Sequence, residues 1–214
     1  MSSAAPLTEG AASSTFPPAM PSPVASRESK QPGQKGEESE TLKPLTPAEF
    51  RGFNRLAEHM DMFHEHFRTT WNTLWAAACA GDGVTAGRSP RARALIDEGL
   101  SFVTNLEMHH SIEEKHLFPV LARRMPDFQD AEDGGGAGEL LRQHREIDEG
   151  MERFQQYLRA CRDGEQELDM TTLKAHMETW GTVLWTHLDE EVQMLGAENM
   201  RKYWTLEEVK QIGM

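Results

Sequence analysis

The sequence predicts an all-α protein, an up-down-up-down four-helix bundle with a disordered N-terminal tail and a short C-terminal helix. From residue 46 onward the apolar residues recur with helical spacing, and no segment alternates apolar and polar residues as a strand would. The second half of this helical region also repeats the first, which indicates two similar helical hairpins. Four helices of this length joined by short loops are expected to pack as a bundle.

The 214 residues divide into three parts. Residues 1–45 are rich in Ser, Ala, Pro and Glu and contain few large apolar residues, so they are expected to form the disordered tail. Residues 46–200 carry the four helices and suffice for one domain with a sizeable core. Residues 201–214 are expected to form a short helix, beginning near Thr205, that packs on the bundle.

The first hairpin is bounded by clear helix signals. Thr46 and Glu49 form a capping box that opens a helix ending near Ala80. The second helix begins at Pro90, since proline is favoured in the first helical turn, and is expected to reach about Met125. The apolar face of the first helix consists of Leu56, Met60, Phe63, Phe67, Trp71 and Leu74.

The second hairpin follows an acidic, glycine-rich segment, residues 127–138, which is expected to be a surface loop. The third helix is predicted to end near Asp163, and the fourth to start about Asp169 and to include Leu195. The second and fourth helices match at an offset of 78 residues (109 to 187), pairing Phe102 with Trp180, Leu106 with Leu184, Glu113 with Glu191 and Leu117 with Leu195.

Composition excludes several classes of partner and location. The formal net charge of −13 argues against nucleic acid and anionic membrane as partners. No segment approaches the roughly 18 apolar residues that a membrane helix requires, and no secretory signal or mitochondrial presequence is recognisable. The two cysteines form no metal or disulfide motif, as expected in a reducing compartment, so a cytoplasmic protein is predicted; no oligomeric state is indicated.

Two copies of the pattern His-x-x-x-Glu are the most informative feature of the chain. They occur at His109 with Glu113 and at His187 with Glu191. On a helix this spacing places the imidazole and the carboxylate on one face, one turn apart, where both can bind the same metal ion. The first and third helices each add one histidine at corresponding positions, and the candidate metal ligands are His64, His109, Glu113, His144, His187 and Glu191.

A metal ion explains this set better than a purely structural role does. A lone inward histidine is more often a hydrogen-bonded core residue, but six such groups in register without partners would cost several kcal/mol each. Four imidazoles and two carboxylates exceed the needs of one tetrahedral zinc ion and include no thiolate. Iron or manganese in octahedral geometry fits better, and six donors divided between two ions would leave an open coordination position.

Further polar residues lie close to this set in the sequence. By helical angle His110 is as interior as His109, so it is either an additional ligand or a group that supports the ligands. Glu114 and Glu190 adjoin the two ligand glutamates and are candidates to bridge or to hydrogen-bond the imidazoles. Of the remaining histidines, His59 and His66 are expected at the edge of the apolar face or in solvent. His116 is expected at a helix interface, and His176 in a structural position.

The segment His109–Pro119 (HHSIEEKHLFP), its repeat at His187–Glu191 and the single histidines His64 and His144 resemble the hemerythrin-like (HHE cation-binding) domain family over about residues 46–200. The resemblance implies a hemerythrin-like four-helix bundle with a non-haem di-iron centre, two Fe ions joined by carboxylate and oxo or hydroxo bridges. It further implies a protein that binds dioxygen or nitric oxide, or stores or senses iron, rather than an enzyme. By motif position it makes the six candidate residues the iron ligands.

One position departs from the oxygen-carrying branch of that family, which has a second histidine one turn after the third-helix ligand, where this chain has Asp148. An alternative is a ferritin-like di-iron oxidase or peroxidase, a class built on Glu-x-x-His motifs from two helices. Glu107-x-x-His110 and Glu113-x-x-His116 match that motif, but both lie on one helix. A metal-free helical interaction module is a further alternative.

Overall fold

The computed structural model describes residues 43–80, 89–129 and 137–213. Most of the predicted disordered tail, residues 1–45, therefore lies outside the described residues, as do residues 130–136 of the predicted surface loop. Within the described ranges the secondary structure is helical and includes no strand, which confirms the predicted all-α class. None of the helices in these ranges has both the length and the apolar character needed to span a membrane.

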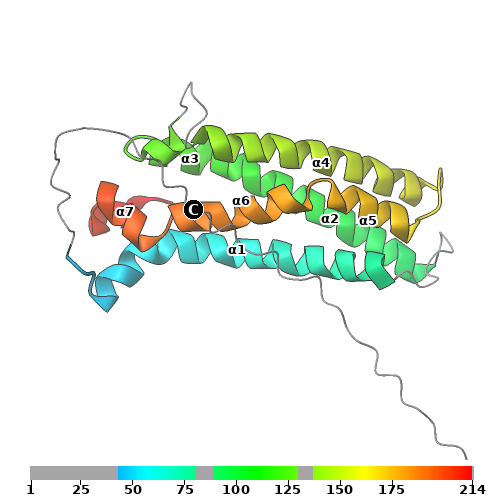
Figure 1. Cartoon of the computed structure of the whole chain (residues 1–214), viewed down its shortest axis with the longest axis horizontal. Coiled ribbons are helices and arrows are strands. Elements are labelled where there is room, and N and C mark those ends of the chain that lie inside the picture. The colour runs from blue at the N-terminus through cyan, green and yellow to red at the C-terminus, as the bar shows by residue number, and fades with distance from the viewer. Residues whose placement is uncertain (1–42, 81–88, 130–136, 214) are drawn as a thin grey trace, which may run out of the picture. The chain divides into compact units, whose positions relative to one another are not determined.

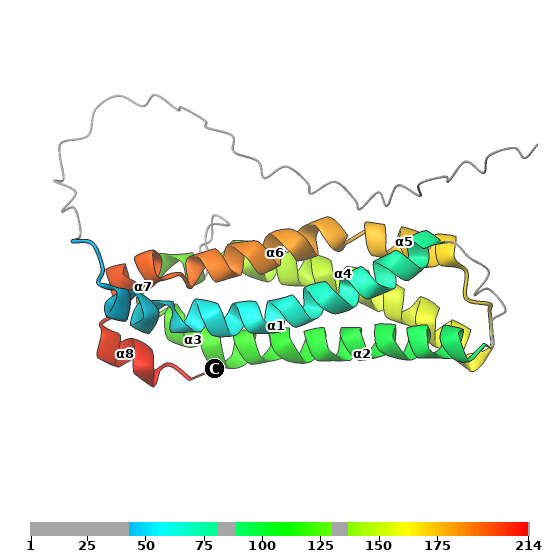
Figure 2. The same cartoon turned by 90° about the horizontal axis from the view of Figure 1, so that it is seen from below.

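Four long helical segments lie side by side (Figures 1 and 2). They are α1 (Pro47–Ala80), α2 (Pro90–Ile112), α4 (Ala137–Asp163) and the consecutive pair α5 (Met170–Glu178) and α6 (Gly181–Met194). Helix α1 contacts α2, α5 and α6, and α4 contacts the same three helices. Side chains at the centre of this arrangement are thus surrounded by helices on all sides.

Hydrogen-bonded caps fix where the helices begin. Glu49 Oε2 accepts a hydrogen bond from the Thr46 N–H (2.8 Å), and Thr46 Oγ1 accepts one from the Glu49 N–H (3.3 Å), so the predicted capping box forms. Ser89 Oγ accepts from the Ala92 N–H at 3.1 Å and caps α2. The carboxylate of Asp169 accepts from the Thr172 N–H at 2.6 Å and caps α5, where the fourth helix was expected to start.

The second helix, predicted to reach about Met125, is helical only as far as Leu121 and is not α-helical throughout. It passes into a π-helical turn, Glu113–Leu117, in which the Phe118 N–H donates to the Glu113 carbonyl, and continues as the short helix α3 (Phe118–Leu121) and a 3₁₀ turn (Pro126–Phe128). Pro119 explains the change: proline has no N–H to donate, and in an α-helix its ring would clash with the carbonyl four residues earlier. The wider π-helical turn removes that clash.

The fourth helix is also interrupted, at Trp180, whose backbone (φ −134°, ψ −3°) is not helical. Its indole packs directly on Gly150 of α4: a Cβ added there would lie 2.3 Å from Trp180 Cγ. On the other side, Trp180 meets the Trp71 ring edge to face, with centroids 4.8 Å apart. The side chain is 1% exposed. We attribute the break in the helix to the close packing of this buried indole.

Two short helices follow α6 and pack on α1. The first, α7 (Ala197–Tyr203), was not predicted. The second, α8 (Leu206–Gln211), is the expected C-terminal helix and begins with a capping box between Thr205 and Glu208. Arg55 of α1 donates to the carbonyl of Val209 at 2.8 Å and to that of Ile212 at 3.0 Å, which attaches this helix to the bundle.

The apolar interior consists of two separate clusters. The first apolar core lies along α1, α2, α4, α5 and α6 and includes Trp71, Phe102, Phe154 and Trp180. The second apolar core lies among α1, α3, α4, α7 and α8 and includes Leu56, Met60, Leu121 and Met200. Phe63 belongs to neither and is 42% exposed, so its predicted place on the inward face of the first helix is wrong.

Candidate metal centre

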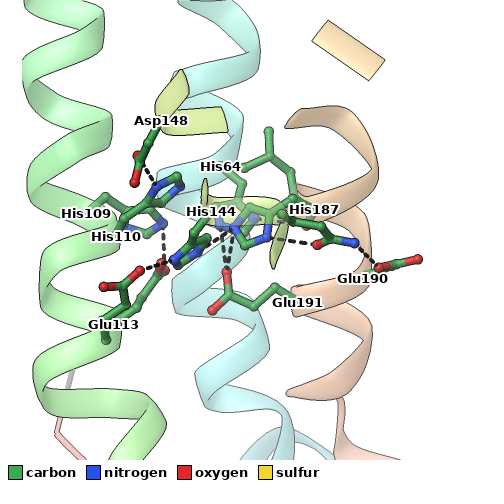
Figure 3. A network of polar contacts seen from close by, with 12 residues as sticks. His64, His109, His110, Glu113, His144, Asp148, His187, Glu190 and Glu191 are labelled. Atoms are coloured by element: carbon green, nitrogen blue, oxygen red, sulfur yellow. Dashed lines mark hydrogen bonds and ion pairs between the residues drawn. The ribbon is translucent and has the colours of Figure 1, made fainter. Parts of the chain in front are cut away.

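Polar side chains from several helices meet inside the bundle and form a layer (Figure 3). Along the helices this layer falls between residues of the two apolar cores. On α1, for example, His64 falls between Met60 of the second core and Phe67 of the first. All six predicted ligands belong to this layer, together with His110. Helix α1 contributes His64, α2 contributes His109 and His110, the π-helical turn contributes Glu113, α4 contributes His144, and α6 contributes His187 and Glu191.

These seven residues form two groups that share one carboxylate. In each group every residue offers a ligand atom, and those atoms lie within 4.8 Å of one another. The first group comprises His110, Glu113, His144 and His187, and the second comprises His64, His109, Glu113 and Glu191. Glu113 Oε1 lies 2.8 Å from His109 Nε2, whereas its Oε2 lies 3.5 Å from His144 Nε2, so the carboxylate lies between the groups.

Glu191 faces the same space from the opposite side of the layer. Its Oε2 lies 3.3 Å from His64 Nε2 and 3.7 Å from His187 Nε2. The Nε2 atoms of His144 and His187 are themselves only 3.2 Å apart. Figure 3 shows these imidazoles and the two glutamates directed toward one another from different helices.

Three of the imidazoles form a hydrogen bond through Nδ1, the ring nitrogen that does not face the other ligands. His64 Nδ1 donates to the Leu188 carbonyl (2.9 Å) and His144 Nδ1 donates to Glu114 Oε1 (2.8 Å). Such contacts place the proton on Nδ1 and leave the lone pair of Nε2 directed into the layer, as metal-binding histidines require. Glu114 thus has the supporting role that the sequence suggested for it.

The third imidazole, His187, donates through Nδ1 to Gln143 Oε1 at 3.2 Å. The amide nitrogen of Gln143 in turn donates to Glu190 Oε2 at 2.6 Å, so Glu190 acts on the imidazole through Gln143 rather than directly. Gln143 is not among the residues predicted from the sequence, although it shares the inward face of α4 with Leu140 and Ile147. That helical spacing is the signal that could have identified it.

Unpaired polar atoms show that the layer fits a metal. Within the described chain, the buried atoms without a hydrogen-bond partner include Nε2 of His64 and of His109, both ring nitrogens of His110 and all four carboxylate oxygens of Glu113 and Glu191. Each such atom costs about 1–3 kcal/mol when left unsatisfied. With their protons on Nδ1, His144 and His187 also direct two lone pairs at each other. A cation bound here would satisfy these groups together.

The electrostatics of the layer favour the protonation states that bind metal. Burial, aided by the neighbouring histidines, lowers the pKa of His109 to about 3 and lowers the pKa values of His110 and His187 well below the ordinary value. These imidazoles are therefore neutral, which is the form that coordinates a metal. Burial, and secondarily the charge of Glu191, raises the pKa of Glu113. A bound cation would favour the charged carboxylate, which burial disfavours.

The structure also places the residues of the alternative patterns. Glu107 and His116 are exposed and lie outside both groups, so neither Glu-x-x-His pair of the ferritin-like alternative comes together. The exposure of His116 shows that its expected place at a helix interface is wrong. Asp148 is in neither group; its Oδ1 lies 3.6 Å from His110 Nδ1, on the outer side of that ring.

The other three histidines lie away from the layer, as expected. His66 is exposed and His59 is half-buried, with its ring 5.0 Å from that of Phe63. His176 is half-buried and stacks on Tyr157, with ring centroids 4.9 Å apart, which agrees with the structural role expected of it.

Comparison with known proteins gives one match. The family model of the hemerythrin HHE cation binding domain matches residues 55–197, a span that contains all seven residues of the layer. No curated protein and no solved structure matches the chain.

Proposed function

The chain belongs to the hemerythrin HHE cation-binding family, and from that premise we propose that it is a non-haem iron protein whose buried layer holds two iron ions and binds dioxygen or nitric oxide. The observation that carries the proposal is the position of Glu113 between two groups of ligand atoms. A carboxylate that offers one oxygen to each group is suited to join two ions. One shared ligand and three further ligands per group make two adjacent metal positions.

The donor set supports iron rather than zinc. Imidazole nitrogens and carboxylate oxygens supply all the ligand atoms, and neither Cys79 nor Cys161 belongs to either group. A structural zinc site would be closed by four ligands and would commonly include thiolates. Nitrogen and oxygen ligands in excess of four suit an octahedral iron pair. Ferrous iron with an open coordination position, when bound here, would coordinate a small diatomic molecule.

The surrounding residues support the binding of a small apolar molecule. The Phe67 ring lies 5.1 Å from that of His109, and Leu106, one turn before His110, is fully buried. These side chains exclude water from the first-core side of the layer. The side chain of His109 is 11% exposed, in contrast to the complete burial of His64 and His187, so the layer is nearest to solvent at His109.

The proposal includes an up-down-up-down four-helix bundle in the cytoplasm. The contacts of α1 with α2, of α2 with α4, of α4 with α6 and of α6 with α1 support this order of the helices. The free state of Cys79 and Cys161 supports a reducing compartment. Storage or sensing of iron is the second candidate function, because the same six predicted ligands would bind iron whether or not a diatomic molecule follows.

Metal analysis and absorption spectroscopy of the full chain test the proposal. The protein would be loaded anaerobically with Fe(II), desalted, and analysed for iron and zinc; about two iron ions per chain are expected. Exposure to dioxygen or nitric oxide should then produce a visible charge-transfer band. Bound iron without any such band would favour storage or sensing, whereas zinc alone, or no metal, would contradict the proposal.

A further inference from the structure

His110 differs from His64, His144 and His187 in having no hydrogen-bonded partner, although both of its ring nitrogens are buried. Its side chain is 4% exposed, and neither Nδ1 nor Nε2 forms a hydrogen bond. A buried histidine with a structural role would normally pair at least one ring nitrogen, as His64 does with the Leu188 carbonyl. Two unpaired nitrogens on one buried ring indicate an imidazole that is free to coordinate a metal ion.

The ring of His110 is held in a defined orientation beside two of the predicted ligands. It stacks on the His144 ring with centroids 3.8 Å apart and planes 8° apart, and it meets the His187 ring edge-on at 5.4 Å. A ligand atom of His110 also lies within 4.8 Å of those of Glu113, His144 and His187. One nitrogen of the ring therefore lies close to the ligand atoms of three other potential ligands.

Asp148 lies next to His110 Nδ1, on the outer side of the ring. It lies one turn after His144 on α4, and its Oδ1 is 3.6 Å from His110 Nδ1 (Figure 3). The Asp148 side chain is 55% exposed, so a small rotation can shorten this contact to a hydrogen bond. A carboxylate that accepts from Nδ1 would fix the proton there and leave Nε2 free for the metal, as carboxylates behind metal-bound histidines do.

We propose that His110 is the fourth protein ligand of the first group and that Asp148 is its positioning residue, an inference that rests on the proposed metal-binding function. With His110 the first group has three imidazoles and the shared carboxylate, whereas the second has two imidazoles, Glu191 and the shared carboxylate. The two positions therefore differ in charge. Without His110 the first position would have only Glu113, His144 and His187.

The test is an anaerobic titration of the metal-free full chain with Co(II), whose visible absorption reports ligand number, combined with metal analysis. Wild type should bind two ions. His110→Ala should lose one ion or bind it at least about tenfold more weakly, and free imidazole added to this variant should restore the second ion and its spectrum. His116→Ala is the matched control, because His116 is exposed on the following turn and should behave as wild type.

Asp148→Asn tests the positioning role without disturbing the interior. It should still bind two ions, with the second weakened about 10- to 100-fold, while Glu149→Gln at the exposed neighbouring position should have no effect. Circular dichroism of the metal-free variants establishes that each is folded. If His110→Ala does not fold, His110→Gln, which retains the bulk of the side chain, replaces it and should show the same loss.

The outcomes separate this inference from the proposed function. If wild type binds no metal, the proposed function fails. If wild type binds two ions and the His110 variants bind two with unchanged affinity and an unchanged Co(II) spectrum, only the assignment of His110 is overturned. If Asp148→Asn alone is indistinguishable from wild type, Asp148 loses its positioning role.

Discussion

Gln143 Oε1 accepts a hydrogen bond from His187 Nδ1 at 3.2 Å, and this contact fixes which nitrogen of His187 faces the metal layer. The orientation of the amide is determined because its nitrogen donates to Glu190 Oε2 at 2.6 Å and to Glu139 Oε1 at 3.2 Å. Ionised carboxylates only accept, so the amide oxygen is left for His187. A buried, uncharged side chain thus connects two outer carboxylates to a predicted ligand.

Replacing this amide should weaken metal binding without abolishing it. Gln143→Leu leaves Nδ1 of His187 without an acceptor, and the loss of such a supporting contact typically lowers metal affinity about 10- to 100-fold. Competition with a chelator of known affinity measures the change. Gln156→Leu, at an exposed position of the same helix, is the control and should bind as wild type. Equal affinities in the two variants would show that Gln143 is not needed to orient His187.

Glu113→Gln should impair both metal positions at once, because Glu113 belongs to both groups. By contrast, His64→Ala removes a member of the second group only and should leave one ion bound. Iron per chain after anaerobic loading distinguishes the two variants. Retention of two ions by Glu113→Gln would contradict the shared carboxylate.

Glu113→Gln, which should impair metal binding, should not reduce the stability of the metal-free protein. Burial raises the pKa of Glu113, because removing the carboxylate from water costs free energy when it is charged. A neutral amide at this position does not carry that desolvation cost. Denaturant unfolding of the metal-free chain is therefore expected to show Glu113→Gln at least as stable as wild type. A marked loss of stability would mean that Glu113 has a structural partner.

Gly150→Ala should destabilise the fold, because the added methyl group would lie 2.3 Å from Trp180 Cγ and the indole has no free space to move into. Overpacking of this kind costs about 1–3 kcal/mol. Gly52→Ala is the matched control: its nearest neighbour is the flexible end of Leu206, 2.6 Å away, which can rotate. Denaturant unfolding monitored by tryptophan fluorescence compares the two, and equal stabilities would contradict the close packing at Trp180.

Acidification should loosen the C-terminal helices in a defined pH range. The hydrogen bonds from Arg124, followed by those from Thr205, lower the pKa of Glu208 to about 2. A lowered pKa contributes stability above the unfolded value, near 4.5, and that contribution disappears as the pH falls toward 2. Because Glu208 is at the surface, the effect on overall stability should be small.

Nuclear magnetic resonance of the Glu208 side chain is the direct measurement, and Arg124→Gln should raise its pKa. The substitution also removes the guanidinium from the face of the Trp204 ring, 4.8 Å away. Lys210→Gln, which removes only an exposed pair with Glu207, is the control and should not change the titration of Glu208. An unchanged pKa in Arg124→Gln would assign the effect to Thr205 alone.

The sequence was sufficient to predict the four long helical segments and the inward histidines on them, because burial imposes helical spacing on every turn of a packed helix. It could not resolve His109 from His110, since both lie within the interior arc; the structure places them in different groups of potential ligands. The interruption at Trp180 depends on Gly150, thirty residues away, and the π-helical turn depends on a tertiary context that tolerates Pro119. Such features arise from packing between helices, which periodicity within one helix does not report.

The division of the interior into two apolar cores has a consequence for cooperativity. Apolar contacts couple the residues within each core, whereas the layer between them contains many buried polar atoms without a hydrogen-bond partner. The two ends of the bundle should therefore open as separate units when metal is absent, with fast amide hydrogen exchange in the turns that bear His64 and His187. Bound cations would connect α1, α2, α4 and α6 through their shared ligands, so that the two ends of the bundle would open as one cooperative unit. Amide hydrogen exchange along the whole bundle would then report a single, higher free energy of opening when metal is bound.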